Sequence, residues 1–137
     1  LSLNNPVLCI IKPDFSRNKE VVYTIMQKIS EFKLESSMEK YLQFSKEDSL
    51  KLYHEYCDIL IEYGYMDSVE KIIHPLISTS IQHIATVFIV SGDNTYAKLK
   101  AIKKIIRDSL SKTYYNNVLH SSDSYDATLH EMMILDL

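Results

Sequence analysis

The sequence contains only two glycines, Gly64 and Gly92, among its 137 residues. Loops that bind phosphate through backbone amides need several closely spaced glycines, so P-loop and dinucleotide-binding loops are excluded. Cysteine is equally scarce: Cys9 and Cys57 cannot build a disulfide framework, and we expect both thiols to be reduced. Cys9 lies in an apolar segment and is expected to be a small core residue. A phosphate-bearing ligand would therefore have to be held by side chains.

The sequence also lacks an excess of basic residues and long hydrophobic runs. Lys and Arg number 15 against 18 Asp and Glu, so the net charge of −3 offers no basic surface for nucleic acid. No apolar stretch approaches the roughly 20 residues of a membrane-spanning helix, and no signal peptide is evident. We therefore predict a cytoplasmic protein without membrane or nucleic-acid partners. The length and the 46% hydrophobic content predict a single domain over residues 1–137.

Apolar periodicity predicts an alternation of strands and helices. A half-buried strand is predicted over 34–44, with Leu34, Met38, Leu42 and Phe44 on one face. A capping-box pattern at Ser45 predicts a further helix start. The predicted strands span 7–11, 34–44, 84–90 and 132–135, and the predicted helices span 18–33, 96–110 and 123–130. This order is βαββαβ with additional helices, which predicts a ferredoxin-like α+β fold with an antiparallel sheet.

Two short motifs contain the residues that suggest chemistry. His120 begins the serine- and aspartate-rich turn 120–124, and Glu131 follows it. A neutral imidazole is a nucleophile near neutral pH, and an acceptor can fix its tautomer. A single histidine is usually an ordinary loop residue, so the second motif matters: Lys12-Pro13-Asp14 directly follows the first predicted strand. A lysine in a proline-restricted turn can place a positive charge beside phosphoryl oxygens.

These two segments resemble the signature motifs of the nucleoside diphosphate kinase family. The first is Ile11–Asp14, and the second is Asn117–Ser124 followed by Glu131 and Met132. The resemblance implies the same ferredoxin-like fold. It also implies transfer of the γ-phosphate from a nucleoside triphosphate to a nucleoside diphosphate through a phosphohistidine. Mg²⁺ would be bound with the nucleotide phosphates, and no metal site is expected in the protein itself.

The resemblance assigns a role to each matching residue. His120 corresponds to the phosphorylated nucleophile, Glu131 to its supporting carboxylate, and Ser122 to a serine between them. Lys12 corresponds to a lysine near the transferring phosphate and counts among the catalytic residues. The nucleotide-binding positions are Lys12, Tyr53, Lys100, Arg107 and Asn117.

The phosphate-binding positions depart from the family pattern. Lys100 stands where one family arginine falls, and the long loop with its threonine is missing. An ungapped alignment places Arg107 at the second arginine, whereas an alignment on 108–110 places Ser111 there. Two hypotheses follow: an active phosphotransferase, or a catalytically impaired member that binds nucleotide or acts as a scaffold. The missing loop also favours a homodimer over a hexamer.

Overall fold

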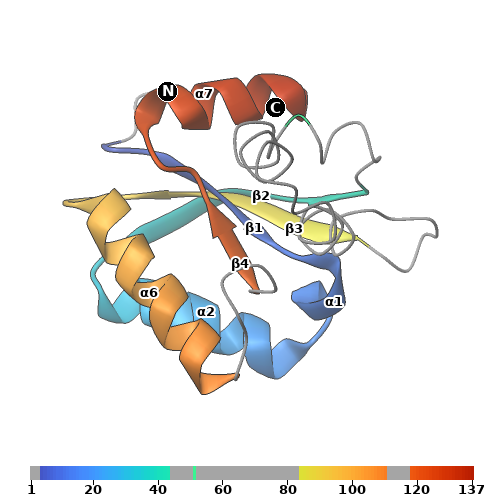
Figure 1. The fold of residues 1–137 in the computed structure, drawn as a ribbon, viewed down its shortest axis with the longest axis vertical. Coiled ribbons are helices and arrows are strands. Elements are labelled where there is room, and N and C mark those ends of the chain that lie inside the picture. Colours follow the sequence, from blue (N-terminus) through green and yellow to red (C-terminus); the bar gives the residue numbers. More distant parts are fainter. Residues whose placement is uncertain (1–3, 44–50, 52–83, 111–117) are drawn as a thin grey trace, which may run out of the picture.

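The computed structural model describes residues 4–43, 51, 84–110 and 118–137, and Figure 1 shows their arrangement. The element order agrees with the βαββαβ arrangement of a ferredoxin-like α+β fold, so that prediction is confirmed. The elements are β1 (Val7–Ile11), α1 (Pro13–Ser16), α2 (Lys19–Glu31), β2 (Glu35–Leu42), β3 (Ala85–Ser91), α6 (Thr95–Ser109), β4 (Leu119–Ser121) and α7 (Tyr125–Ile134).

The four strands form one sheet in the order β2-β3-β1-β4, and each neighbouring pair is antiparallel. The central strands β1 and β3 are buried along their whole length. The sequence of a strand that is covered on both faces is a continuous apolar run. Both β1 and β3 show this pattern, so the sequence predicts them well. The short strand β4 forms an edge of the sheet.

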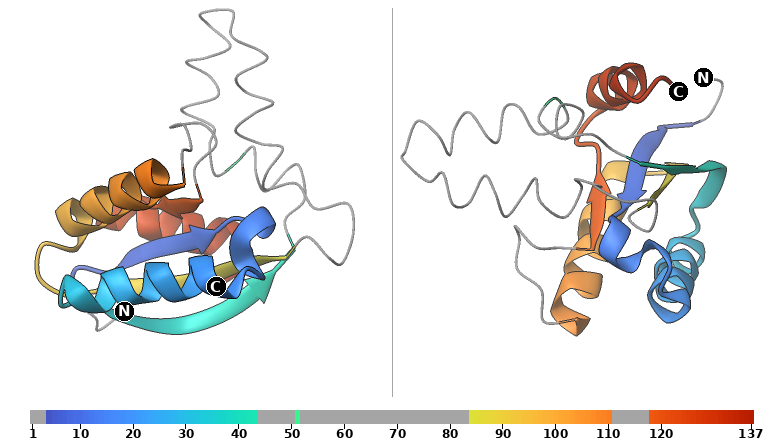
Figure 2. Two further views of the ribbon diagram at one scale, coloured as in Figure 1. Left: turned by 90° about the horizontal axis from the view of Figure 1, so that it is seen from below. Right: turned by 90° about the vertical axis from the view of Figure 1, so that its right-hand side faces the viewer.

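Helices cover both faces of the sheet (Figure 2). On one face α2 and α6 pack against Val7, Cys9 and Ile11, and on the other α7 packs against Leu8 and Ile10. The alternation follows from the two-residue period of a strand. Burial raises the pKa of the Cys9 thiol, so this cysteine is the unreactive core residue that the sequence predicts. No helix within the described ranges is long and apolar enough to cross a bilayer.

Local sequence signals explain where α2 begins and which face it buries. The Asn18 side chain accepts hydrogen bonds from the backbone N–H groups of Glu20 and Val21, which satisfies two donors at the helix start. Helical spacing then places Val21, Ile25 and Ile29 in the core. The first predicted helix is thereby confirmed. The same spacing along α6 buries Leu99, Ile102 and Ile106, so the second is confirmed as well.

The prediction of a last strand over 132–135 is wrong. Helix α7 continues through Ile134, and β4 supplies the fourth strand of the sheet. Two causes account for the error. A strand of three residues is too short to show a period. In addition, α7 carries apolar residues on its outer side, so its C-terminal turn has no amphipathic helical pattern.

The predicted common face of Leu34, Met38 and Leu42 is also wrong. The register of β2 against β3 shifts between Ser37 and Lys40, and Met38 has a left-handed φ of 56°. Such a bulge interrupts the alternation of side chains. Leu34 consequently packs on the α2 side and Leu42 on the α7 side, while Met38 is 50% exposed. Phe44, the fourth residue of that predicted face, and the helix start predicted at Ser45 lie outside the described residues.

Gly92, which follows β3, should not tolerate a side chain. Its φ is 147°, and a Cβ there would lie 2.8 Å from the Leu34 side chain and 3.4 Å from the Lys33 carbonyl oxygen. We expect Gly92→Ala to lower the free energy of unfolding by about 1–3 kcal/mol, because both the backbone and the packing are strained. Urea denaturation measures this loss. An unchanged midpoint and slope would contradict the assigned backbone geometry.

Candidate functional site

Strand β4 directs the His120 side chain to the α7 face of the sheet. β4 pairs with β1 so that His120 lies opposite Ile10, whereas Leu119 lies opposite Ile11 and Ser121 opposite Cys9. Residues that are directly opposite in an antiparallel pair point to the same face. Since Ile10 faces α7, His120 does too. Its side chain retains 15% of its full exposure, so it borders solvent at an edge of the sheet.

Helix α7 supplies the partner of His120. The Ser124 hydroxyl accepts a hydrogen bond from the Ala127 N–H, which caps the helix immediately after the turn. Glu131 lies on the inner side of this helix and is 5% exposed. Its Oε1 lies 2.5 Å from Nε2 of His120. A carboxylate accepts only, so the neutral imidazole carries its proton on Nε2 and the lone pair on Nδ1.

Lys12 directly follows β1 and is paired with a residue two positions before His120. Its backbone N–H donates to the Val118 carbonyl at 3.0 Å, so the pairing of β1 with β4 continues one residue beyond the strand. The extended backbone at Lys12 also continues the alternation of β1. By the two-residue period of a strand, we expect Lys12 to share the side of Ile10 and therefore to lie diagonally beside His120. Lys12 is 2% exposed, so its charge is largely shielded from water.

Ser122 does not lie between His120 and Glu131 in this structure. Its hydroxyl donates to the Leu8 carbonyl at 3.4 Å, and its backbone N–H donates to the same oxygen at 2.9 Å. His120 and Glu131 contact each other directly instead. Ser122 therefore attaches the turn after β4 to β1.

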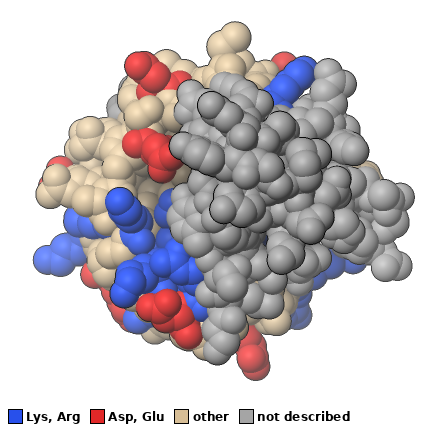
Figure 3. All heavy atoms as spheres, viewed as in Figure 1, with Lys and Arg blue, Asp and Glu red and all other residues tan. Residues whose placement is uncertain are grey.

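Lys100 and Arg107 lie on α6, which covers the opposite face of the sheet from α7. Because β4 is the edge strand, their side chains have access to His120 only around that edge. Lys and Arg side chains gather over α6 in Figure 3. The structure thus places these two cations on the helix that covers the α2 face of the sheet, rather than on the face that carries His120 and Glu131.

Lys103 lies on the same face of α6 as Lys100 and Arg107, and it was not among the predicted site residues. It follows Lys100 by three residues and precedes Arg107 by four, so the three share a helix face. Lys103 is only partly exposed, and burial lowers its pKa while Asp123, in the turn after His120, raises it. The spacing alone was enough to suggest this residue. Tyr53 and Asn117, by contrast, lie outside the described residues.

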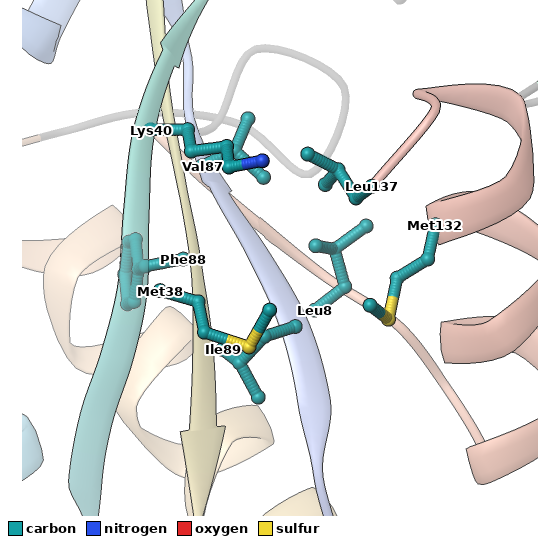
Figure 4. A pocket seen from close by; sticks show the side chains of 8 residues that line it. All are labelled: Leu8, Met38, Lys40, Val87, Phe88, Ile89, Met132 and Leu137. Atoms are coloured by element: carbon teal, nitrogen blue, oxygen red, sulfur yellow. The ribbon is translucent and has the colours of Figure 1, made fainter. Parts of the chain in front are cut away.

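A small apolar pocket on the α7 face is separate from His120. It lies between β2 and the C-terminal end of α7, where Met38 and Lys40 face Met132 and Leu137 (Figure 4). Its lining includes neither His120 nor Lys12. The pocket is therefore no part of the candidate site.

The structure resembles known nucleoside diphosphate kinases over nearly its whole length. The enzyme from Aquifex aeolicus matches with a TM-score of 0.68 at 17% identity, covering 96% of this chain and 94% of that one. The enzyme from Borrelia burgdorferi, solved as a transition-state mimic with bound vanadate and ADP, matches with a TM-score of 0.69 at 20% identity, covering 98% and 88%. The enzyme from Encephalitozoon cuniculi matches with a TM-score of 0.66 at 16% identity, covering 95% and 87%. At these identities the likeness shows a common fold.

Comparison by sequence is more selective. No curated protein matches the chain. The family model described as nucleoside diphosphate kinase, however, matches residues 5–135. That range includes both motifs and every element from β1 to α7. The chain therefore belongs to the nucleoside diphosphate kinase family.

Proposed function

We propose that this chain transfers the γ-phosphate of a nucleoside triphosphate to a nucleoside diphosphate through a phosphohistidine at His120. The observation that supports this most directly is the 2.5 Å contact between His120 Nε2 and Glu131 Oε1. A buried carboxylate at that nitrogen presents the other nitrogen as the nucleophile. Family membership supports phosphotransfer to or from nucleotides in general. The bond between Nε2 and Glu131 supports Nδ1 as the attacking atom.

The reaction would proceed in two displacements. In the first, the Nδ1 lone pair of His120 attacks the γ-phosphorus, the Nδ1–P bond forms, and the bond from phosphorus to the β,γ-bridging oxygen breaks. The nucleoside diphosphate leaves with that electron pair. The ring is then cationic, and Glu131 stabilises it through the Nε2 proton. In the second, a terminal oxygen of another nucleoside diphosphate attacks the phosphorus, and the N–P bond returns its electrons to Nδ1.

Charge on the transferring group would be balanced from two sides. Lys12 would contact the γ-phosphate on the His120 face, while Lys100 and Arg107 would approach the phosphates around the β4 edge. Tyr53 and Asn117 remain predicted nucleotide contacts. Phosphoryl transfer depends chiefly on such positioning and charge stabilisation.

We propose a cytoplasmic homodimer as the assembly. The composition supports the location, and the missing loop favours the dimer.

The described residues contain no group of three or more His, Cys, Asp or Glu side chains that could hold a metal ion. Glu131 already bonds to His120. We propose that Mg²⁺ is coordinated mainly by the nucleotide phosphates and water. When bound in this way, it neutralises phosphate charge. The chain itself contributes the ammonium and guanidinium groups.

Incubation with γ-labelled ATP and Mg²⁺ tests the proposed function. We expect label on the protein that is lost in acid and retained in alkali, and that is discharged by added nucleoside diphosphate. Mass spectrometry should locate it on His120. If the protein binds nucleotide but takes up no label, the alternative stands: a catalytically impaired family member that acts as a nucleotide-binding module.

Replacing Lys12 with methionine should slow phosphorylation of His120 by about 10²–10³-fold, because a buried charge next to the transferring group is lost. Methionine is also unbranched and fills similar space, so the fold should persist. Single-turnover labelling at saturating ATP measures the effect. Lys104→Met is the matched control, since Lys104 is an exposed residue that pairs with Asp108 on α6. Equal rates in the two variants would contradict a role for Lys12.

A further inference from the structure

Thr128 connects α7 to the start of β1 through a completely buried side chain. The backbone N–H of Leu8 donates to the Thr128 hydroxyl oxygen at 3.3 Å, and this hydroxyl donates to the Pro6 carbonyl at 3.3 Å. Both backbone groups belong to the core of the molecule. A hydroxyl that satisfies a buried donor and a buried acceptor at once is costly to remove.

Tyr96 brings α6 to the same place. Its hydroxyl donates at 2.9 Å to the Pro6 carbonyl, the same oxygen that accepts from Thr128. Burial raises the pKa of Tyr96, so the phenol stays a neutral donor over the physiological range. Side chains from α6 and α7 thus meet on one backbone carbonyl, which restrains both helices against β1.

Leu8 is hydrogen-bonded to residues close to both members of the histidine–carboxylate pair. Its N–H binds Thr128, which precedes Glu131 by three residues on the inner face of α7. Its carbonyl accepts from the backbone N–H of Ser122, two residues after His120. The two sides of the pair are therefore attached to a single residue of a fully buried strand. One hydrogen bond holds α7 against β1, and the other holds the turn after β4 against the same strand.

We propose that Thr128 is a positioning residue, which holds Glu131 against Nε2 of His120 by attaching α7 to Leu8 and Pro6. The consequence for the reaction rates rests on the proposed function, whereas the effect on the imidazole does not. Without the hydroxyl, the Leu8 N–H and the Pro6 carbonyl lose a partner in the core. We expect α7 to shift so that these groups can form other hydrogen bonds, and the Glu131 carboxylate moves with the helix.

Nitrogen NMR of the histidine ring tests the proposal directly. At about pH 9 an ordinary imidazole is neutral, and its two ¹⁵N shifts reveal which nitrogen carries the proton. We expect the parent and Thr128→Ser, which keeps the hydroxyl, to hold the proton on Nε2 of His120. Thr128→Val, which keeps the shape and removes the hydroxyl, should show a mixture of tautomers. Single-turnover phosphorylation should fall by about 10–100-fold in the valine variant and remain near the parent rate in the serine variant.

A control variant tests whether loss of stability alone changes the tautomer of His120. Ile102→Val removes a buried methylene group from α6 on the opposite face, and it should lower the denaturation midpoint without changing the tautomer. Should Thr128→Val fail to fold, Thr128→Ala also removes the hydroxyl and should show the same mixture of tautomers. A folded Thr128→Val or Thr128→Ala protein with its proton still on Nε2 would overturn the proposal. A tautomer change in a protein that is never phosphorylated would uphold the positioning role and refute the proposed function.

Discussion

Substituting His120 with alanine should abolish acid-labile phosphorylation of the protein. The expected loss is complete, since the alanine variant has no nucleophile at the position where the ring meets Glu131. The assay is incorporation of γ-label at saturating nucleotide, followed by acid and alkali treatment.

His130→Ala serves as the matched control. His130 also lies on α7, one residue before Glu131, but it is exposed on the outside of the helix. We expect this variant to take up label at the parent rate. Label that persists in His120→Ala and disappears in His130→Ala would show that His130, on the outer side of α7, carries the phosphate. The proposed mechanism would then fail.

Glu131→Gln should lower the rate of His120 phosphorylation by about 10²–10⁴-fold. Glutamine keeps the size of the side chain and can still accept a hydrogen bond, but it carries no charge to stabilise the cationic ring. Its amide can also donate to the imidazole, which favours the wrong tautomer. Neutralising the carboxylate behind the histidine of a catalytic triad has an effect at the upper end of this range, about 10⁴-fold.

Single-turnover labelling of the glutamine variant, with nucleotide affinity measured separately, tests this expectation. The affinity should change little, because Glu131 is 5% exposed and its carboxylate is bonded to His120. A variant that binds nucleotide tenfold more weakly yet phosphorylates at the parent rate would show that the carboxylate acts in binding. That result would contradict the mechanism while leaving His120 as the nucleophile.

The sequence predicts the central part of the fold because long, regular segments show their period. The strands β1 and β3 are continuous apolar runs that are buried on both faces, and α2 and α6 bury one side in every turn. The errors fall where a period is interrupted or too short. The bulge near Met38 reverses the faces of β2, and the three-residue strand β4 was missed in favour of a strand within α7.

The same distinction holds for the candidate site. The sequence by itself determined that His120, Glu131 and Lys12 are the residues with suitable chemistry, because their motifs depend on residue type and local spacing. Only the tertiary structure decided which atoms meet. Strand register places His120 opposite Ile10 on the α7 face, the packing of α7 brings the Glu131 carboxylate to Nε2, and Ser122 turns away to Leu8. Thr128 has no recognisable signal in the sequence, since its role arises from contacts between residues 120 positions apart. Such contacts depend on how elements pack, and packing is a property of the whole fold rather than of any segment.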